Sequence, residues 1–379
     1  MNKHLVLLIS MLIMSVAARA QSSVTLYGVA DDGITYTNNQ KGASNVQMFS
    51  GGLGGSKFGL LGKEELGGGM SAIFQLESGY DVNSGKLGYN QRLWGRQSYV
   101  GLSSSYGSLR LGRQYDFMVT NLQPLSSDFS FGGSLSSHAG DVDGIWGSYP
   151  ISNAVKYLSP TFRGLNVGGL YSFGGVPGST ARARAYGFGA NYAMGGLKLG
   201  LAYLNVNNPA TALYDASTGP VAGKPFTNPV TNPIYSGYAS ARNVQIFGLG
   251  GDYVLGATTF GAVYTYTHFT DAVATPGSPF QGSASLNTAE GYVSYRFTPF
   301  VMGGLVYEYT KTPSAHYNEL ALGSQYFFSK RTFVYLIAAW QRASGIDSTG
   351  HAAVADLTYL TASSTSNQAA VRVGIRHSF

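Results

Sequence analysis

Hydrophobic and polar residues alternate almost without error along the last segment of the chain. Val371, Val373 and Ile375 fall on one parity, and Arg372 and Arg376 fall on the other. Because successive side chains of a strand point to opposite sides, this segment predicts a β-strand with one apolar and one charged face. A soluble sheet would turn the apolar face toward its core. A transmembrane barrel would turn it toward lipid and keep the charged face in a wet lumen.

Short and long connections between such strands alternate along the chain. Seven short turns are predicted at 65–69, 103–107, 159–164, 193–196, 254–258, 297–300 and 328–332. Eight longer connections are predicted at about 39–55, 82–90, 114–152, 174–184, 207–242, 268–285, 310–316 and 344–366. Together these connections would join sixteen strands. We therefore predict an all-β fold, a 16-stranded antiparallel transmembrane β-barrel with short periplasmic turns and long external loops, a size that leaves an aqueous channel.

Three segments do not follow the pattern cleanly. Residues 332–340 are apolar on both faces and residues 243–254 have an ambiguous pattern, so the orientation of neither segment can be assigned from parity. The long segment 207–242 holds five prolines, and we expect it to be irregular and exposed at the surface.

The start of the chain predicts export and therefore favours the membrane alternative. Lys3 opens a short basic start, an apolar run follows over residues 5–16, and Ala18-Arg19-Ala20 has the small-x-small form of a cleavage site. The run is too short to span a membrane comfortably, which disfavours the alternative of a retained anchor. We expect residues 1–20 to be a cleaved signal peptide and residues 21–379 to form one outer-membrane barrel domain.

Composition agrees with a wall that is wet on one face and apolar on the other. Charged residues make up 11% of the chain, against roughly 25% in typical soluble domains. The chain has 52 glycines, 27 tyrosines and no cysteine, which excludes disulfides and thiolate metal sites. No spacing of ligands predicts a metal or a cofactor. The net charge of +6 is diffuse, and no basic run with interleaved aromatics predicts nucleic-acid binding.

Several motifs together resemble one family. They lie at residues 23–29 (SVTLYGV), 56–69 (SKFGLLGKEELGGG), 72–77 (AIFQLE), 99–103 (YVGLS), 111–114 (LGRQ) and 153–157 (NAVKY), with Phe379 at the end. The chain thereby resembles the general trimeric porins of beta-proteobacteria, the group of the neisserial and Burkholderia-type porins. The resemblance implies a homotrimer in the Gram-negative outer membrane, with one diffusion pore per protomer. It also implies that Phe379 is part of the signal that the barrel-assembly machinery recognises.

The segment 114–152 is the candidate constriction loop. It is much longer than the roughly 12–15 residues beyond which loops are usually functional or disordered. It holds no Lys or Arg, and its acidic residues are Asp116, Asp128, Asp141 and Asp143. Its aromatic residues would pack against a neighbouring surface. We expect it to fold into the barrel as the third external loop, as the resemblance implies; the alternative is a surface loop that packs only on its neighbours.

Basic residues of the barrel wall should face this loop. Strand parity places Arg110 and Lys156 in the lumen, and it places Arg96 on the face opposite Gln97 and Tyr99. In the family, basic residues at the positions that match Arg96 and Lys156 line the constriction. Charged residues on the two sides of a narrow gap would set ion selectivity, and the low-dielectric wall would focus their field.

The family pattern is not complete in this chain. A third family position, on the second strand, is usually basic, but Leu61 occupies it here. The missing cation weakens the expected positive wall and leaves the ion preference open.

These residues predict a general diffusion channel for ions and small hydrophilic solutes. A substrate-specific channel, for example one selective for sugars, is the alternative, since Trp94, Trp146, Tyr149 and Tyr157 could offer an aromatic path, although parity turns Tyr157 toward lipid. A barrel with a plugged lumen is a third possibility. We do not expect an enzyme, because the adjacent carboxylates Asp31 and Asp32 would point to opposite faces of a strand and no nucleophile elbow occurs.

Overall fold

Alternate residues of strand β17 (Asn367–Ser378) point to opposite sides in the computed structural model, which describes residues 22–379. Val371, Val373 and Ile375 are exposed on the outer surface, whereas Arg372 is fully buried inside. The predicted signal peptide at residues 1–20 lies outside the described residues. Within residues 22–379, no helix has the length and apolar character that crossing a membrane requires.

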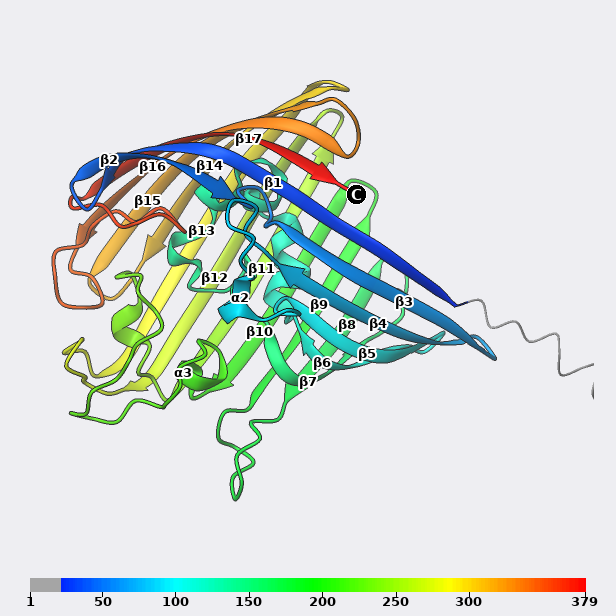
Figure 1. The fold of residues 1–379 in the computed structure, drawn as a ribbon, viewed down its shortest axis with the longest axis horizontal. Helices are drawn as coiled ribbons and strands as arrows, with labels where there is room; N and C mark the ends of the chain where they lie inside the picture. Colours follow the sequence, from blue (N-terminus) through cyan, green and yellow to red (C-terminus); the bar gives the residue numbers. More distant parts are fainter. Residues whose placement is uncertain (1–21) are drawn as a thin grey trace, which may run out of the picture.

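The described residues form one closed antiparallel sheet (Figure 1). Its strands are β1 (Ser23–Gln40), β2 (Ala43–Ser50), β3 (Lys57–Gly67), β4 (Met70–Gly79), β5 (Gln97–Ser104), β6 (Gly107–Gln114), β7 (Ile151–Leu158), β8 (Leu165–Ser172), β9 (Ala185–Met194), β10 (Leu197–Asn207), β11 (Asn243–Leu255), β12 (Thr258–Ala272), β13 (Gly282–Thr298), β14 (Val301–Lys311), β15 (Ala315–Phe327), β16 (Thr332–Gly345) and β17. Pairing of β1 with β17, where Val29 lies opposite Ser378, closes the barrel.

The predicted count of sixteen wall strands is confirmed. Strands β2 and β3 both pair with β1, β2 along its second half and β3 along its first. They are two parts of one wall strand that is interrupted at residues 51–56, so the seventeen strands of the sheet make sixteen strands of wall. The seven predicted short turns all occur, and they lie at the end of the barrel opposite the long loops (Figure 1).

The prediction of a long first connection at about 39–55 is wrong. The chain turns back within two residues, Lys41 and Gly42, both of which have positive φ, as a tight hairpin turn requires. Strand β2 follows at once with a polar lumen face, and polar strand residues resemble a loop in the sequence. The glycines at 51–55 leave the sheet and enter the lumen instead.

The loops are more buried than the sequence suggests. They contain the short helices α2 (Gly88–Gln91) and α3 (Pro209–Ala212) and the helical turn η6 (Ser236–Tyr238). The expectation that 207–242 lies exposed is wrong for its two ends: Leu213, Tyr214, Ile234 and Tyr235 are buried. These apolar residues cover the loop that fills the barrel, and only the middle of the segment remains at the surface.

The two strands that parity could not orient have an apolar lumen face for a physical reason. In β16, Tyr335 and Ile337 point inward and are buried against Phe131 and Leu135 of segment 114–152. In β11, Ile246 packs inward in the same way on the first part of that segment. Both faces of these strands are apolar because one meets lipid and the other meets a loop.

Candidate functional site

Segment 114–152, here called the constriction loop, lies inside the barrel, which confirms the predicted infolding. It is built from short helical turns, η1 (Met118–Leu122), η2 (Gln123–Leu125), η3 (Asp128–Gly132), η4 (Gly133–Ser136) and η5 (Ala139–Asp141). Most of its large apolar side chains are almost completely buried, among them Phe117, Met118, Leu122, Phe131 and Leu135, whereas Phe129 is exposed, contrary to the expectation that the aromatic residues pack. The buried side chains pack on the inner face of strands β9 to β16.

Glycines on the wall make room for the loop. They are Gly168, Gly189, Gly200, Gly248, Gly304 and Gly323, here called the glycine track. A Cβ at Gly189 would lie 2.6 Å from the Phe117 ring, and one at Gly248 would lie 2.4 Å from Leu122 Cδ1. Contacts this short do not occur between real carbon atoms, so any larger residue would push the loop away from the wall. The track accounts for part of the high glycine content.

Lys156 is covered by the constriction loop. The residue is only 2% exposed. Its Nζ donates to the main-chain oxygen of Tyr115 at 2.9 Å and lies 4.3 Å from the centroid of the Phe117 ring. This lysine, predicted from parity to face the lumen, therefore holds the start of the loop against β7.

The four predicted aspartates stabilise the loop itself. Asp116 Oδ1 accepts the Met118 N–H at 2.6 Å, and Asp128 accepts the Ser126 hydroxyl. Asp141 accepts the Trp146 N–H at 3.0 Å and the Ser148 hydroxyl. All four residues, Asp143 included, are buried. Burial raises the pKa of Asp116 to about 6, and burial with the neighbouring Asp143 raises the pKa of Asp141 to about 7.

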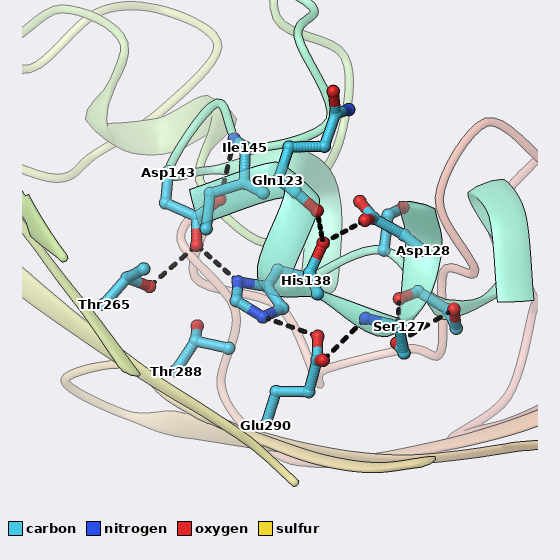
Figure 2. Close-up of polar contacts among 12 residues, drawn as sticks. Gln123, Ser127, Asp128, His138, Asp143, Ile145, Thr265, Thr288 and Glu290 are labelled. Atoms are coloured by element: carbon cyan, nitrogen blue, oxygen red, sulfur yellow. Dashed lines mark hydrogen bonds and ion pairs between the residues drawn. The ribbon is translucent and has the colours of Figure 1, made fainter. Parts of the chain in front are cut away.

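His138 joins the loop to the wall (Figure 2). Its Nδ1 lies 2.5 Å from Asp143 Oδ2, and its Nε2 lies 3.2 Å from Oε2 of Glu290 on β13. Asp143 also accepts the hydroxyl of Thr265 on β12 at 2.7 Å. Burial alone would lower the pKa of His138, but Asp143 and Glu290 raise it well above the ordinary value. The imidazolium is therefore a cationic pin between two carboxylates.

The wall under this pin carries carboxylates that the sequence analysis did not single out. Glu290, Glu308 and Glu319 are paired across neighbouring strands β13, β14 and β15, and all three are nearly fully buried. Alternation could have placed them in the lumen, but nothing in the sequence shows that the loop covers them. Within residues 22–379, no group of three or more acidic or histidine side chains has an arrangement that could hold a metal ion.

Arg96 lies on the opposite side of the loop, just before β5. Its Nε donates to Glu77 Oε1 at 2.7 Å, and its Nη1 donates to the Tyr89 hydroxyl at 3.0 Å. Arg110 stacks on Tyr99, with 5.1 Å between the guanidinium carbon and the ring centroid. The expectation that Tyr99 faces away from the lumen is wrong: strand β5 begins at Gln97, so parity cannot be continued back to Arg96.

Two arginines of the last strand hold the inward segment 51–56, a role that parity alone did not reveal. Arg372 donates to the Ser134 hydroxyl at 2.8 Å and lies over the Phe49 ring, and Arg376 donates to the Leu53 carbonyl. Asp31 accepts the Leu53 N–H at 2.6 Å and the Tyr335 hydroxyl at 2.7 Å. The segment therefore joins the constriction loop to the closure of the barrel.

Besides a cavity of about 410 Å³ beside Phe129 and Ser130, at the short-turn ends of β11 to β13, two cavities border the second half of the loop. The first, of about 460 Å³, is bounded by segment 49–56, residues 79–90, Arg96 and the end of the constriction loop. The second, of about 550 Å³, is bounded by Asp141, Asp356 and residues 229–235. Ser148, Tyr149 and Tyr359 border both, so the last long loop, residues 346–366, also narrows the lumen. Of the predicted wall residues, only Arg96 borders either cavity.

Two further candidates lie away from the cavities. Phe379 pairs with Gly28, the two residues exchanging main-chain hydrogen bonds at 3.1 and 3.0 Å, at the point where the barrel closes. Leu61 lies opposite Gln75, whose side chain bonds Tyr27 and Tyr99, so Leu61 belongs to the lumen face. The cations on the same face of its strand are Lys57, whose Nζ lies 3.9 Å from Glu77, and Lys63, whose Nζ lies 2.5 Å from Glu65.

Comparisons with known proteins agree with this architecture. A family model described as Gram-negative porin matches residues 6–345. An outer membrane porin protein of Bordetella pertussis is 28% identical, with 96% of each chain covered. An anion-selective porin from Comamonas acidovorans superposes with a TM-score of 0.72 at 23% identity, covering 95% of this chain and 100% of its own. OmpT of Vibrio cholerae, in a trimer form, superposes with a TM-score of 0.63 at 14% identity, covering 94% and 99%.

Proposed function

This chain belongs to the Gram-negative porin family and is a general diffusion channel of the outer membrane, and we propose that its solutes cross between the constriction loop and the wall that carries Arg96. The supporting observation is the asymmetry of the loop. One side is packed on the glycine track and leaves a cavity of about 410 Å³ beside Phe129, and the other borders the two larger cavities of about 460 and 550 Å³. Ions and small hydrophilic solutes would pass there without a bound state, down their own gradients.

We infer a moderate preference for anions. The aspartates of the loop are occupied by its own N–H and hydroxyl groups and by His138. Burial raises the pKa of Asp356, as of Asp141, to about 7, so each is only partly charged at neutral pH. Arg96 and Lys57, by contrast, share a single carboxylate, Glu77. The wall therefore retains excess positive charge even though Leu61 replaces one cation.

The test is single-channel recording in a planar bilayer under a KCl gradient. We expect conductance in groups of three equal steps and a reversal potential of the anion-selective sign. Arg96→Gln should move that potential toward cations, and Arg163→Gln, on an exposed short turn, serves as the matched control. A cation-selective parent channel, or an unchanged potential in Arg96→Gln, would contradict the role of this wall.

We also propose a homotrimer and an assembly role for Phe379. Porin relatives form trimers, and this chain would bury part of its exposed apolar outer surface in the same way. Phe379 closes the barrel with Gly28 and leaves its ring about half exposed, so the ring is accessible to the barrel-assembly machinery. Deletion of Phe379 should lower the surface level far more than Phe379→Tyr, and equal levels of the two variants in outer-membrane fractions would disprove recognition of the terminal aromatic.

A further inference from the structure

Aromatic rings from four separate segments converge on the 460 Å³ cavity beside Arg96, here called the aromatic cavity. The rings are Phe49, Tyr80, Tyr89, Trp146, Tyr149 and Tyr359. None of them is fully buried, so their surfaces are available to a solute. A volume of this size lies within the range of small-molecule sites, which are mostly apolar with a few fixed polar groups. A plain aqueous passage would not require six rings around one cavity.

The guanidinium of Arg96, which borders these rings, is held in place by its hydrogen bonds. Nε and Nη1 of Arg96 are bound to Glu77 and Tyr89, and its Nη2 makes no hydrogen bond with the described residues. Lys86 borders the cavity as a second cation. The carboxylate of Asp81, which also borders it, accepts the N–H and hydroxyl of Ser84 within its own turn. A guanidinium with a free N–H group is suited to bind a carboxylate.

The backbone around the cavity is held in an uncommon conformation. Tyr89, Asn90 and Gln91 have φ of 52°, 57° and 61° in succession, and Tyr359 has φ of 63°. Such left-handed residues persist only where surrounding contacts hold them, and they cluster at ligand sites. The contacts are present: the Tyr89 hydroxyl donates to the Gly147 carbonyl at 3.1 Å, and the Tyr359 hydroxyl bonds to Ser148. The rings are therefore positioned before a solute arrives.

We propose that the aromatic cavity is a binding site for aromatic carboxylates, with the ring of the solute against the packed pair Trp146 and Tyr359 and beside Tyr89, and with its carboxylate on Arg96. This inference rests on the proposed function, because the solute must enter the same passage. Stacked or edge-to-face rings attract one another beyond simple burial. A neutral sugar would use the rings but would not offer a carboxylate to the free Nη2 group of Arg96.

The experiment is block of the KCl current through single channels by benzoate at pH 7. We expect saturable block by benzoate and at least about fivefold weaker block by cyclohexanecarboxylate, which keeps the charge but lacks the aromatic ring, since each ring contact is modest in strength. Glucose and benzyl alcohol should block more weakly still. Trp146→Leu should weaken benzoate block about fivefold, whereas Trp340→Leu, on the outer surface of β16, should leave it unchanged.

Each outcome decides between the two proposals. A channel that conducts KCl but is not saturably blocked by benzoate would overturn the aromatic site and leave diffusion intact. Equal block by cyclohexanecarboxylate would reduce the cavity to a general anion site, and stronger block by glucose would make it a sugar site; either result also overturns the proposal. Absence of KCl conductance in folded protein would contradict the proposed function itself. Direct titration by Trp fluorescence quenching with benzoate gives a second readout that does not depend on conduction.

Discussion

The two sides of the lumen meet the constriction loop in different ways. Strands β8 to β15 present glycines, and the loop lies directly on their backbone. The segments from β2 to β5 present long side chains such as Arg96, Tyr80 and Phe49, and a cavity separates them from the end of the loop. The position of the loop is therefore decided mainly by where side chains are missing. Charged groups fix the loop at a few points such as Lys156 and His138, and wall carboxylates such as Glu308 are buried under it, whereas Arg96 remains on the open side.

The largest effect is expected from replacing His138, the cationic pin between the constriction loop and the wall. His138→Leu would leave Asp143 and Glu290 facing each other without a cation, and breaking a buried pair in this way costs about 3–5 kcal/mol. We expect the loop to leave the wall and the single-channel conductance to rise and fluctuate. His351→Leu, on an exposed part of the last long loop, is the control. A quiet channel of parental conductance in His138→Leu would show that packing alone holds the loop.

A smaller effect on conductance is expected from a substitution in the glycine track. Gly189→Leu would overlap the Phe117 ring, and overpacking of this kind typically costs about 1–3 kcal/mol. Because the barrel strands are held by their own hydrogen bonds, the loop should move and the wall should not. The folded barrel should keep its strand content by circular dichroism while its conductance increases. Gly291→Leu, a glycine with no neighbour within contact distance, should change neither; equal behaviour of the two variants would refute the track.

The same contrast explains what could be predicted from the sequence. Alternation identified the sixteen strands and the short turns because one face of every wall strand meets lipid, whatever the other face meets. It failed at β11 and β16, where the lumen face meets the loop, and at residues 51–56, where glycines leave the sheet. The acidic loop was identified from its composition and from the resemblance, but the partners of its aspartates were not. Those partners, His138 and the loop N–H groups, depend on a loop conformation that has no period in the sequence.

The smallest effect is expected in the pH dependence of ion selectivity, which the groups on the open side of the lumen should control. Asp141 and Asp356 border the second cavity, with Lys41 as the cation on its rim. Burial raises the pKa of both to about 7, and Asp143 contributes for Asp141. Each is therefore largely neutral at pH 5.5 and negatively charged at pH 8.5. For such an acid, whose pKa is raised by folding, the associated stability is present at low pH and is lost as the pH rises through about 7.

Anion selectivity should therefore weaken as the pH rises from 5.5 to 8.5, because two negative charges appear beside the passage. The measurement is the reversal potential in a KCl gradient at both pH values. Asp141→Asn with Asp356→Asn should keep the anion-selective potential of the parent at low pH and remove most of its change with pH. His138 faces Asp143, Glu290 and, further away, Glu308, and these carboxylates raise its pKa well above the ordinary value, which favours the charged form of the pin. A shift toward anions at alkaline pH would mean that charges on the covered side, and not those bordering the cavities, control the passage.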